Sequence, residues 1–207
     1  MKTTKVMLSL LALIAMSIQV HAQMKIEFNK DLEAYTRSLV TELDRIPDTR
    51  KEQLNEIGDF LVSKLQKEEV YNALFVCTHN SRRSHLSDTW FKYALMFYGV
   101  DNLKSYSGGL EATGFHPNTI AALDRAGFTT SYNSSVDNPV VSISPAKFPV
   151  WRMQSKVYSH EVNPKNMFAA VMVCSDADQS CPLVPGAEGR FALPYQDPRY
   201  YDNTPAQ

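Results

Sequence analysis

Residues Cys77 to Ser84 combine a possible nucleophile with groups that bind oxyanions. The segment reads Cys-Thr-His-Asn-Ser-Arg-Arg-Ser. It follows the apolar run 73–76 and precedes a helical stretch, so the loop would join a buried strand to a helix N-terminus. The thiolate is the reactive form of cysteine, and cationic neighbours at a helix N-terminus stabilise it. The segment therefore predicts that Cys77 attacks a tetrahedral oxyanion.

The residues after Cys77 supply the expected anion-binding groups. Backbone N–H groups of the loop can surround an anion at the positive end of the helix. A guanidinium can hold two oxygens of the anion in a bidentate fork, and a serine hydroxyl can hold the thiolate. We therefore expect the oxyanion to be bound by Thr78, His79, Asn80, Ser81, Arg82, Arg83 and Ser84.

A carboxylic acid near the loop is needed to protonate the leaving group. Asp197 is the candidate, because Pro198 would stiffen the segment that carries it. Tyr195, Tyr200 and Tyr201 flank this acid and are candidates to line a slot for an aryl substrate. This chemistry requires no cofactor, and we expect no metal site.

Strands and helices alternate along the chain from residue 72 onward. Strands are expected at 73–76, 103–107 and 168–173, and helices at 84–98 and 117–126. Such alternation is typical of an α/β fold with a parallel sheet and helices on both faces, in which ligands bind beyond the carboxyl ends of the strands. Cys77 and Cys174 fall at such ends, and 140–143 with 155–158 predict an added β-hairpin.

The N-terminal 70 residues predict two segments outside the catalytic domain. Residues 1–22 resemble a cleaved signal peptide, with Lys2 and Lys5 before an apolar run that is short for a membrane anchor. Cleavage after Ala22 would place the protein in the periplasm or outside the cell, whereas a start at Met24 would keep it in the cytoplasm.

Residues 23–70 predict a helical extension, and residues 71–207 predict the catalytic domain. The extension has apolar residues at helical spacing and would form a helical pair or hairpin packed on that domain. The two apolar series are Leu32, Tyr35, Leu39 and Leu43, followed by Leu54, Ile57, Leu61 and Leu65.

Composition is that of an ordinary globular protein. The chain has 207 residues, 44% hydrophobic and 21% charged, with a net charge of −1. A nucleic-acid surface would need a clustered basic excess, which this sequence lacks. We expect no nucleic-acid partner and no membrane contact once the leader is removed.

Residues 74–84 resemble the active-site loop of the low-molecular-weight protein tyrosine phosphatase superfamily. The likeness continues through Tyr106-Ser107-Gly108-Gly109 and Pro117-Asn118, and Asp197-Pro198 matches the family's general acid. The resemblance implies a three-layer sandwich around a central four-stranded parallel sheet. The family usually has Gly at the position of His79 and Cys or a hydrophobe at that of Arg82. The family also closes its sheet with a terminal helix, whereas the given sequence stops at Gln207, just after the acid segment. Either the given sequence is truncated before that helix, or the N-terminal helices cover that face.

The segment from Cys174 to Pro182 is similar to the redox segment of thioredoxin-coupled arsenate reductases within this superfamily. The resemblance implies that Cys77 attacks arsenate, Cys174 releases arsenite, and Cys181 resolves the resulting disulfide. A thioredoxin-like reductant would then be required. The alternative for Cys174 and Cys181 is a structural disulfide in an oxidising compartment.

Three functions remain open at this point. The first is an arsenate reductase, which the paired cysteines favour. The second is a protein tyrosine phosphatase or other phosphomonoester hydrolase with a phosphocysteine intermediate on Cys77, which export favours. The third is a non-catalytic oxyanion-binding or redox-sensing module. Phosphate or arsenate is the expected ligand in every case.

Overall fold

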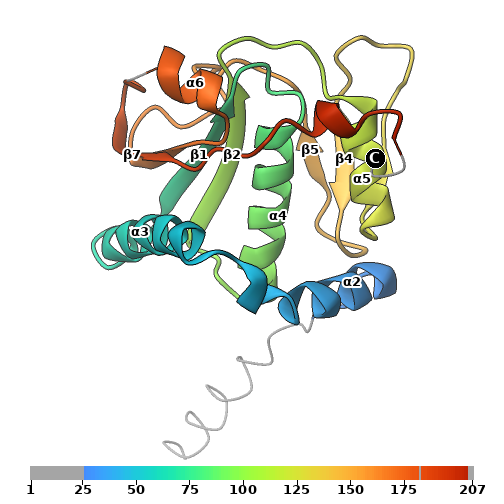
Figure 1. The fold of residues 1–207 in the computed structure, drawn as a ribbon, viewed down its shortest axis with the longest axis horizontal. Helices are drawn as coiled ribbons and strands as arrows, with labels where there is room; N and C mark the ends of the chain where they lie inside the picture. The colour runs from blue at the N-terminus through green and yellow to red at the C-terminus, as the bar shows by residue number, and fades with distance from the viewer. Residues whose placement is uncertain (1–25, 182, 205–207) are drawn as a thin grey trace, which may run out of the picture.

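A four-stranded parallel sheet in the order β2-β1-β6-β7 forms the centre of the molecule (Figure 1). The computed structural model describes residues 26–181 and 183–204, so the predicted signal peptide lies outside the described residues. Helices flank the sheet, which confirms the predicted α/β fold class. The sheet strands are β1 (Tyr71–Cys77), β2 (Leu103–Gly109), β6 (Phe168–Met172) and β7 (Ala187–Ala192), and the helices that follow the first three are α4 (Arg83–Phe97), α5 (Pro117–Arg125) and α6 (Ser175–Ser180).

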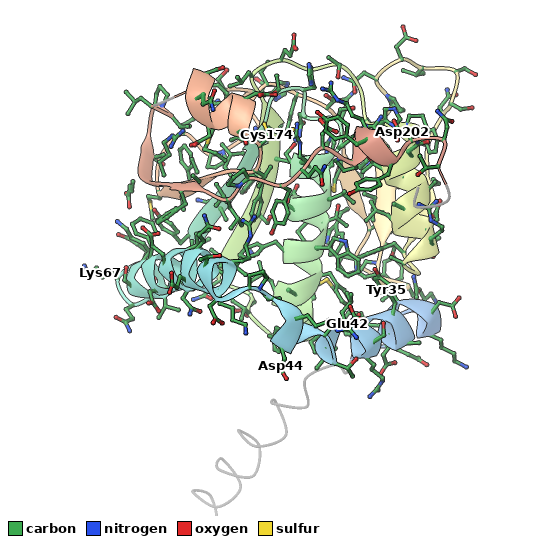
Figure 2. The ribbon with its side chains drawn as sticks, in the orientation of Figure 1. Tyr35, Glu42, Asp44, Lys67, Cys174 and Asp202 are labelled. Carbon is green, nitrogen blue, oxygen red and sulfur yellow. The ribbon has the colours of Figure 1, made fainter. Side chains whose placement is uncertain are left out.

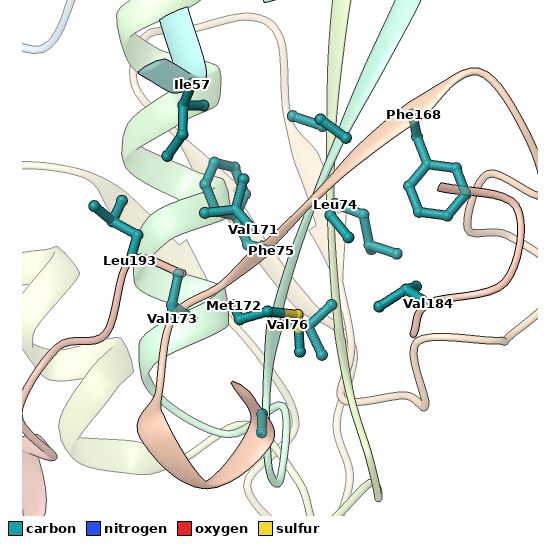
Figure 3. Close-up of a cluster of buried hydrophobic side chains, with 14 of the residues drawn as sticks. Ile57, Leu74, Phe75, Val76, Phe168, Val171, Met172, Val173, Val184 and Leu193 are labelled. Atoms are coloured by element: carbon teal, nitrogen blue, oxygen red, sulfur yellow. The ribbon is translucent and has the colours of Figure 1, made fainter. Parts of the chain in front are cut away.

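The two central strands are apolar along nearly their whole length. Every residue of β6 is buried, and so is every residue of β1 except Asn72. Strands buried on both faces read as continuous apolar runs, which is why these segments could be recognised in the sequence. Figure 3 shows Phe75 and Val171 on one side of the sheet and Leu74 and Phe168 on the other.

The prediction of an added β-hairpin from residues 140–143 and 155–158 is wrong in part. A separate antiparallel sheet contains β3 (Thr129–Ser131), β4 (Val141–Ser144) and β5 (Trp151–Met153), so it has three strands and its last strand precedes 155–158. The segment 155–158 instead lies at the end of β2. There Gly109 N donates to Lys156 O at 2.9 Å, and Tyr158 N donates to Gly109 O at 2.7 Å.

The N-terminal extension contains two helices, as predicted, but they pack on different parts of the domain. α3 (Asp48–Leu65) buries Ile57 and Leu61 in the core of the central sheet. It contacts β1 and β7 and thereby covers part of the sheet face on which α4 lies (Figures 1 and 3). The extension is thus part of the folded domain rather than an independent hairpin.

α2 (Lys30–Val40) is anchored by a single buried leucine. Leu32 is fully buried in a second cluster with Tyr93 of α4 and Phe128. Gly127 has a φ of +98°, and a Cβ there would lie 2.2 Å from Leu32 N, so only glycine allows this close approach. The other predicted positions of this series, Tyr35, Leu39 and Leu43, are 42%, 37% and 50% exposed.

The short 3₁₀ helix η1 (Leu43–Arg45) links α2 to α3, and a second one, η2 (Pro198–Tyr201), lies near the C-terminus. In the part of the chain that the structure describes, none of the helices combines the length and apolar character needed to cross a bilayer.

Leu61→Ala should lower the free energy of unfolding by about 2–4 kcal/mol, because it removes a buried side chain from the core. Leu54→Ala on the same helix is the matched control, since Leu54 is 39% exposed against 5% for Leu61. The control should cost less than about 1 kcal/mol. Urea unfolding measures both values, and equal losses would contradict the packing of α3 on the sheet.

Candidate active site

The anion loop, defined as residues Cys77 to Ser84, joins β1 to α4. Asn80 is its turning point, with a left-handed φ of 44° and no exposed surface. Asparagine tolerates this conformation better than most residues. Its Oδ1 accepts a hydrogen bond from Lys156 N at 2.9 Å, which ties the loop to the segment 155–158.

A chain of hydrogen bonds runs from Asn80 to the Cys77 sulfur. Asn80 Nδ2 donates to Ser84 Oγ at 2.8 Å, and Ser84 Oγ lies 3.0 Å from Cys77 Sγ. Because the amide is the donor to Ser84, the hydroxyl proton of Ser84 is available to the sulfur. This arrangement places a hydrogen-bond donor at the sulfur that was predicted to act as the nucleophile.

The end of β2 supports the anion loop. Leu110 N donates to Cys77 O at 3.1 Å, and Glu111 N donates to Thr78 O at 2.9 Å. A Cβ on Gly109 would lie 2.6 Å from Asn80 N and 2.8 Å from Thr78 O. Only glycine therefore lets the strand pass this close to the loop.

A pocket of about 270 Å³ opens above Cys77. It lies at the N-terminus of α4, where backbone N–H groups and the helix dipole favour an anion. Cationic side chains outnumber the single carboxylate in its wall, so the pocket suits a small oxyanion. Its lining residues are Cys77, His79, Ser81, Arg82, Arg83, Thr113, Asp197 and Arg199.

Asp197 reaches the pocket on the acid loop, defined as residues 193–202. Arg83 Nη2 donates to Asp197 Oδ2 at 2.8 Å, and Arg199 N donates to Asp197 Oδ1 at 3.0 Å. An oxyanion in the pocket would compete with Asp197 for Arg83. The contact therefore couples anion binding to release of the carboxyl group that was predicted as the acid.

The helical extension also contacts the acid loop. Arg50 of α3 donates from Nη2 to Pro194 O at 2.7 Å, and its guanidinium lies 4.9 Å from the Tyr195 ring centroid. The sequence suggested no role for Arg50. It lies far from Pro194 along the chain, so only the fold brings the two together.

His79 and Arg82, which differ from the residues that the family usually has at these positions, each lie against a carboxylate. His79 Nε2 lies 2.9 Å from Glu111 Oε1, and Arg82 forms a bidentate pair with Asp202. Both residues line the pocket, so the predicted contact with an anion stays a prediction. Asp202 had no recognisable signal in the sequence.

Cys174 lies beside the anion loop. It directly follows Val173 at the end of β6, and its Sγ lies 3.4 Å from Thr78 Oγ1. Cys174 and Asp202 both lie toward the upper edge of the molecule in Figure 2. The predicted residues Cys77, Cys174 and Asp197 thus gather at the carboxyl ends of the strands.

Cys181 lies at the other end of α6. Its Sγ donates to Leu183 O at 3.3 Å, and it is a buried free thiol like Cys77 and Cys174. Burial, and then the neighbouring Cys181, raise the pKa of Tyr158 above its usual value. Cys77, Cys174 and Cys181 are thus all unbridged in this structure, so neither a Cys77–Cys174 nor a Cys174–Cys181 disulfide is present.

His85 is a buried titratable group directly after the anion loop. Its ring stacks on Phe115 at a centroid distance of 3.8 Å, and its Nδ1 lies 3.3 Å from Ser107 Oγ. Burial lowers the pKa of His85 well below its usual value, and nearby Lys156 and Lys92 lower it further. His85 is therefore neutral in the folded protein at neutral pH.

Residues 26–181 and 183–204 contain no group of three or more His, Cys, Asp or Glu side chains arranged to hold a metal ion.

The chain is similar to known proteins of one family. Residues 72–142 match the model of the low molecular weight phosphotyrosine protein phosphatase family, a segment that runs from β1 into β4 and is about a third of the chain. The predicted resemblance to this superfamily is confirmed. The curated relatives include an arsenate reductase of Staphylococcus aureus strain Newman, 29% identical over 65% of this chain and 81% of the relative. The family and these relatives are enzymes, as expected for this chain.

Two solved structures are also similar. YfkJ from Bacillus subtilis has a TM-score of 0.46 at 18% identity and covers 66% of this chain and 84% of its own. A low molecular weight protein tyrosine phosphatase from T. tengcongensis has a TM-score of 0.44 at 18% identity, covering 66% and 85%.

The neutral state of His85 should make stability fall in mild acid. As pH drops below about 6.5, the unfolded chain takes up a proton that the folded protein excludes, so the folded state loses stability. Between pH 7.5 and 5.5 this group should cost about 1 kcal/mol. Urea unfolding at both values should show a smaller pH dependence in His85→Gln than in wild type.

The exposed His160 gives the matched control. His160→Gln should keep the wild-type pH dependence of the free energy of unfolding. An unchanged dependence in His85→Gln would contradict the neutral, buried state of His85.

Proposed function

We propose that this protein reduces arsenate to arsenite with a relay of Cys77, Cys174 and Cys181. The observation that carries the proposal is the 3.4 Å contact between Cys174 Sγ and Thr78 Oγ1, which puts a second buried thiol against the anion loop. A phosphatase has no chemical need for that thiol. The arsenate reductases among the relatives give independent support.

In the first step the Cys77 thiolate attacks arsenic. Ser84 holds the thiolate at 3.0 Å until a sulfur–arsenic bond forms. Backbone N–H groups of the anion loop bind the arsenate oxygens, and Arg83 moves from Asp197 to the anion. An arsenate oxygen leaves as water once it has been protonated, and Asp197 is the group placed to supply the proton.

In the second step Cys174 attacks the sulfur of Cys77. A Cys77–Cys174 disulfide forms and the sulfur–arsenic bond breaks. The electron pair of that bond stays on arsenic, which is reduced from As(V) to As(III) and leaves as arsenite. Two thiols thus provide the two electrons.

In the third step Cys181 attacks Cys174 and restores the Cys77 thiol. The two residues flank α6, which at 1.5 Å per residue separates their Cα atoms by roughly 10 Å. A disulfide needs a Cα separation below about 7 Å. α6 must therefore unwind for the Cys174–Cys181 bridge to form, and an external dithiol of the thioredoxin type must reduce that bridge.

Phosphomonoester hydrolysis is the second candidate function, and the Arg83–Asp197 pair favours it. The pair at 2.8 Å puts a carboxyl group at the rim of the pocket, where it can protonate an alcohol or phenol leaving group. A phosphocysteine on Cys77 would then be hydrolysed by water with Asp197 as base. This reaction needs neither Cys174 nor Cys181.

We also propose that residues 1–22 direct export, as their charge and apolar pattern suggest. A reductase in an oxidising compartment would need a dithiol partner in the same compartment. Processing of the leader is tested by the N-terminal sequence of the mature protein, which should begin at Gln23.

Turnover of the cysteine variants separates the two candidate functions. With arsenate, thioredoxin and its reductase, Cys174→Ser and Cys181→Ser should each lose more than about 100-fold in turnover, since each removes a required nucleophile. Cys77→Ser should lose activity toward arsenate and p-nitrophenyl phosphate alike.

The opposite pattern would contradict the reductase. Wild-type protein that hydrolyses p-nitrophenyl phosphate but turns over no arsenate, with hydrolysis unchanged in Cys174→Ser and Cys181→Ser, is a phosphatase. Binding of phosphate without turnover of either substrate would indicate the third function, a non-catalytic oxyanion-binding module.

A further inference from the structure

The C-terminal end of the acid loop is fastened to the anion loop by a second ion pair. Arg82 Nη1 donates to Asp202 Oδ1 at 2.8 Å, and Arg82 Nη2 donates to Asp202 Oδ2 at 2.6 Å. Asn118 Nδ2 adds a third bond to Asp202 Oδ1 at 2.8 Å, and Arg82 Nη2 lies 2.7 Å from His116 Nε2. We name Arg82, His116, Asn118 and Asp202 the latch.

The latch joins three separate parts of the chain. Arg82 precedes α4 in the anion loop, and His116 and Asn118 lie at the start of α5. Asp202 directly follows η2, which begins just after Asp197. A single 3₁₀ turn with Pro198 in its first position connects the two aspartates, so fixing Asp202 restricts Asp197.

A bidentate arginine–carboxylate pair is stronger than an ordinary surface ion pair, especially when it is partly shielded from water. The Arg82 and Asp202 side chains are 13% and 23% exposed. Hydrogen bonds from Arg82 and then Asn118 hold the pKa of Asp202 well below its usual range. Asp202 therefore stays ionised across the pH range of an enzyme assay.

The two adjacent arginines have different partners. Arg83 pairs with Asp197, and an arriving oxyanion would draw it away. Arg82 pairs with Asp202 outside that exchange. The Arg82–Asp202 pair can thus keep the acid loop attached to the anion loop when the Arg83–Asp197 pair is broken.

We propose that Arg82 and Asp202 are positioning residues that hold Asp197 over the anion when Arg83 leaves it. The proposal rests on the proposed function in one respect, namely that Asp197 acts as the proton donor. Neither Arg82 nor Asp202 needs to touch the reacting atoms in this role. A loss of the latch should therefore affect proton transfer more than anion binding.

The test compares two phosphate esters that differ in leaving group. Phenol is a poorer leaving group than p-nitrophenol and depends more on an acid. Asp202→Asn should lower kcat/KM about 10-fold or more for phenyl phosphate and by a clearly smaller factor for p-nitrophenyl phosphate. The inhibition constant of inorganic phosphate should change by less than about 2-fold.

A double-mutant cycle shows whether Asp202 acts through Asp197. Asp202→Asn should have no further effect on phenyl phosphate when Asp197 is already Asn. Glu188→Gln is the matched control, because it breaks an ion pair of similar length, Lys64–Glu188 at 2.6 Å, away from the pocket. It should leave the ratio of the two ester rates unchanged.

Several results would overturn the proposal. These are equal losses on the two esters, a full additional loss in the Asp197→Asn background, and no loss on either ester. If the wild type hydrolyses neither ester, the chain is not a phosphatase for these substrates. Amide hydrogen exchange of the Arg199 N–H, which donates to Asp197, then tests whether the latch restrains the acid loop. Exchange faster by about 10-fold in Asp202→Asn supports the latch, and unchanged exchange overturns it.

Discussion

The left-handed turn at Asn80 is the constraint on which the rest of the site depends. Asn80 takes a left-handed φ there, and its side-chain amide donates to Ser84, which in turn contacts Cys77. The same side chain accepts a hydrogen bond from Lys156 N. One buried asparagine thus links the shape of the loop, the hydrogen bonding of the Cys77 sulfur and the segment 155–158.

The remaining chemistry is arranged around that loop by the sheet. Parallel strands deliver their carboxyl ends to one edge, so β1 brings Cys77, β6 brings Cys174, and the chain beyond β7 brings Asp197 to the same place. Three arginines then hold the acid loop, namely Arg50 from α3, Arg83 and Arg82. The N-terminal extension is therefore coupled to the site as well as to the core.

Local patterns explain what could be predicted from the sequence. The apolar runs 73–76 and 168–173 revealed the central strands, and the Cys77 segment revealed the loop, because each signal lies within a few adjacent residues. The periodicity of the extension revealed its helices but not the surfaces on which they pack. The same periodicity is equally compatible with a helical hairpin. The latch, Arg50 and the pairing of 155–158 with Gly109 depend on contacts between distant parts of the chain, for which a single sequence carries no local signal.

The most direct measurement of the central claim is a trapped intermediate. Cys181→Ser protein, fully reduced and then given arsenate without any reductant, should stop after the second step. Peptide mapping by mass spectrometry should find a Cys77–Cys174 disulfide, with about one arsenite released per protein molecule, since the two thiols supply two electrons. Recovery of both residues as free thiols, with no arsenite formed, would contradict the account.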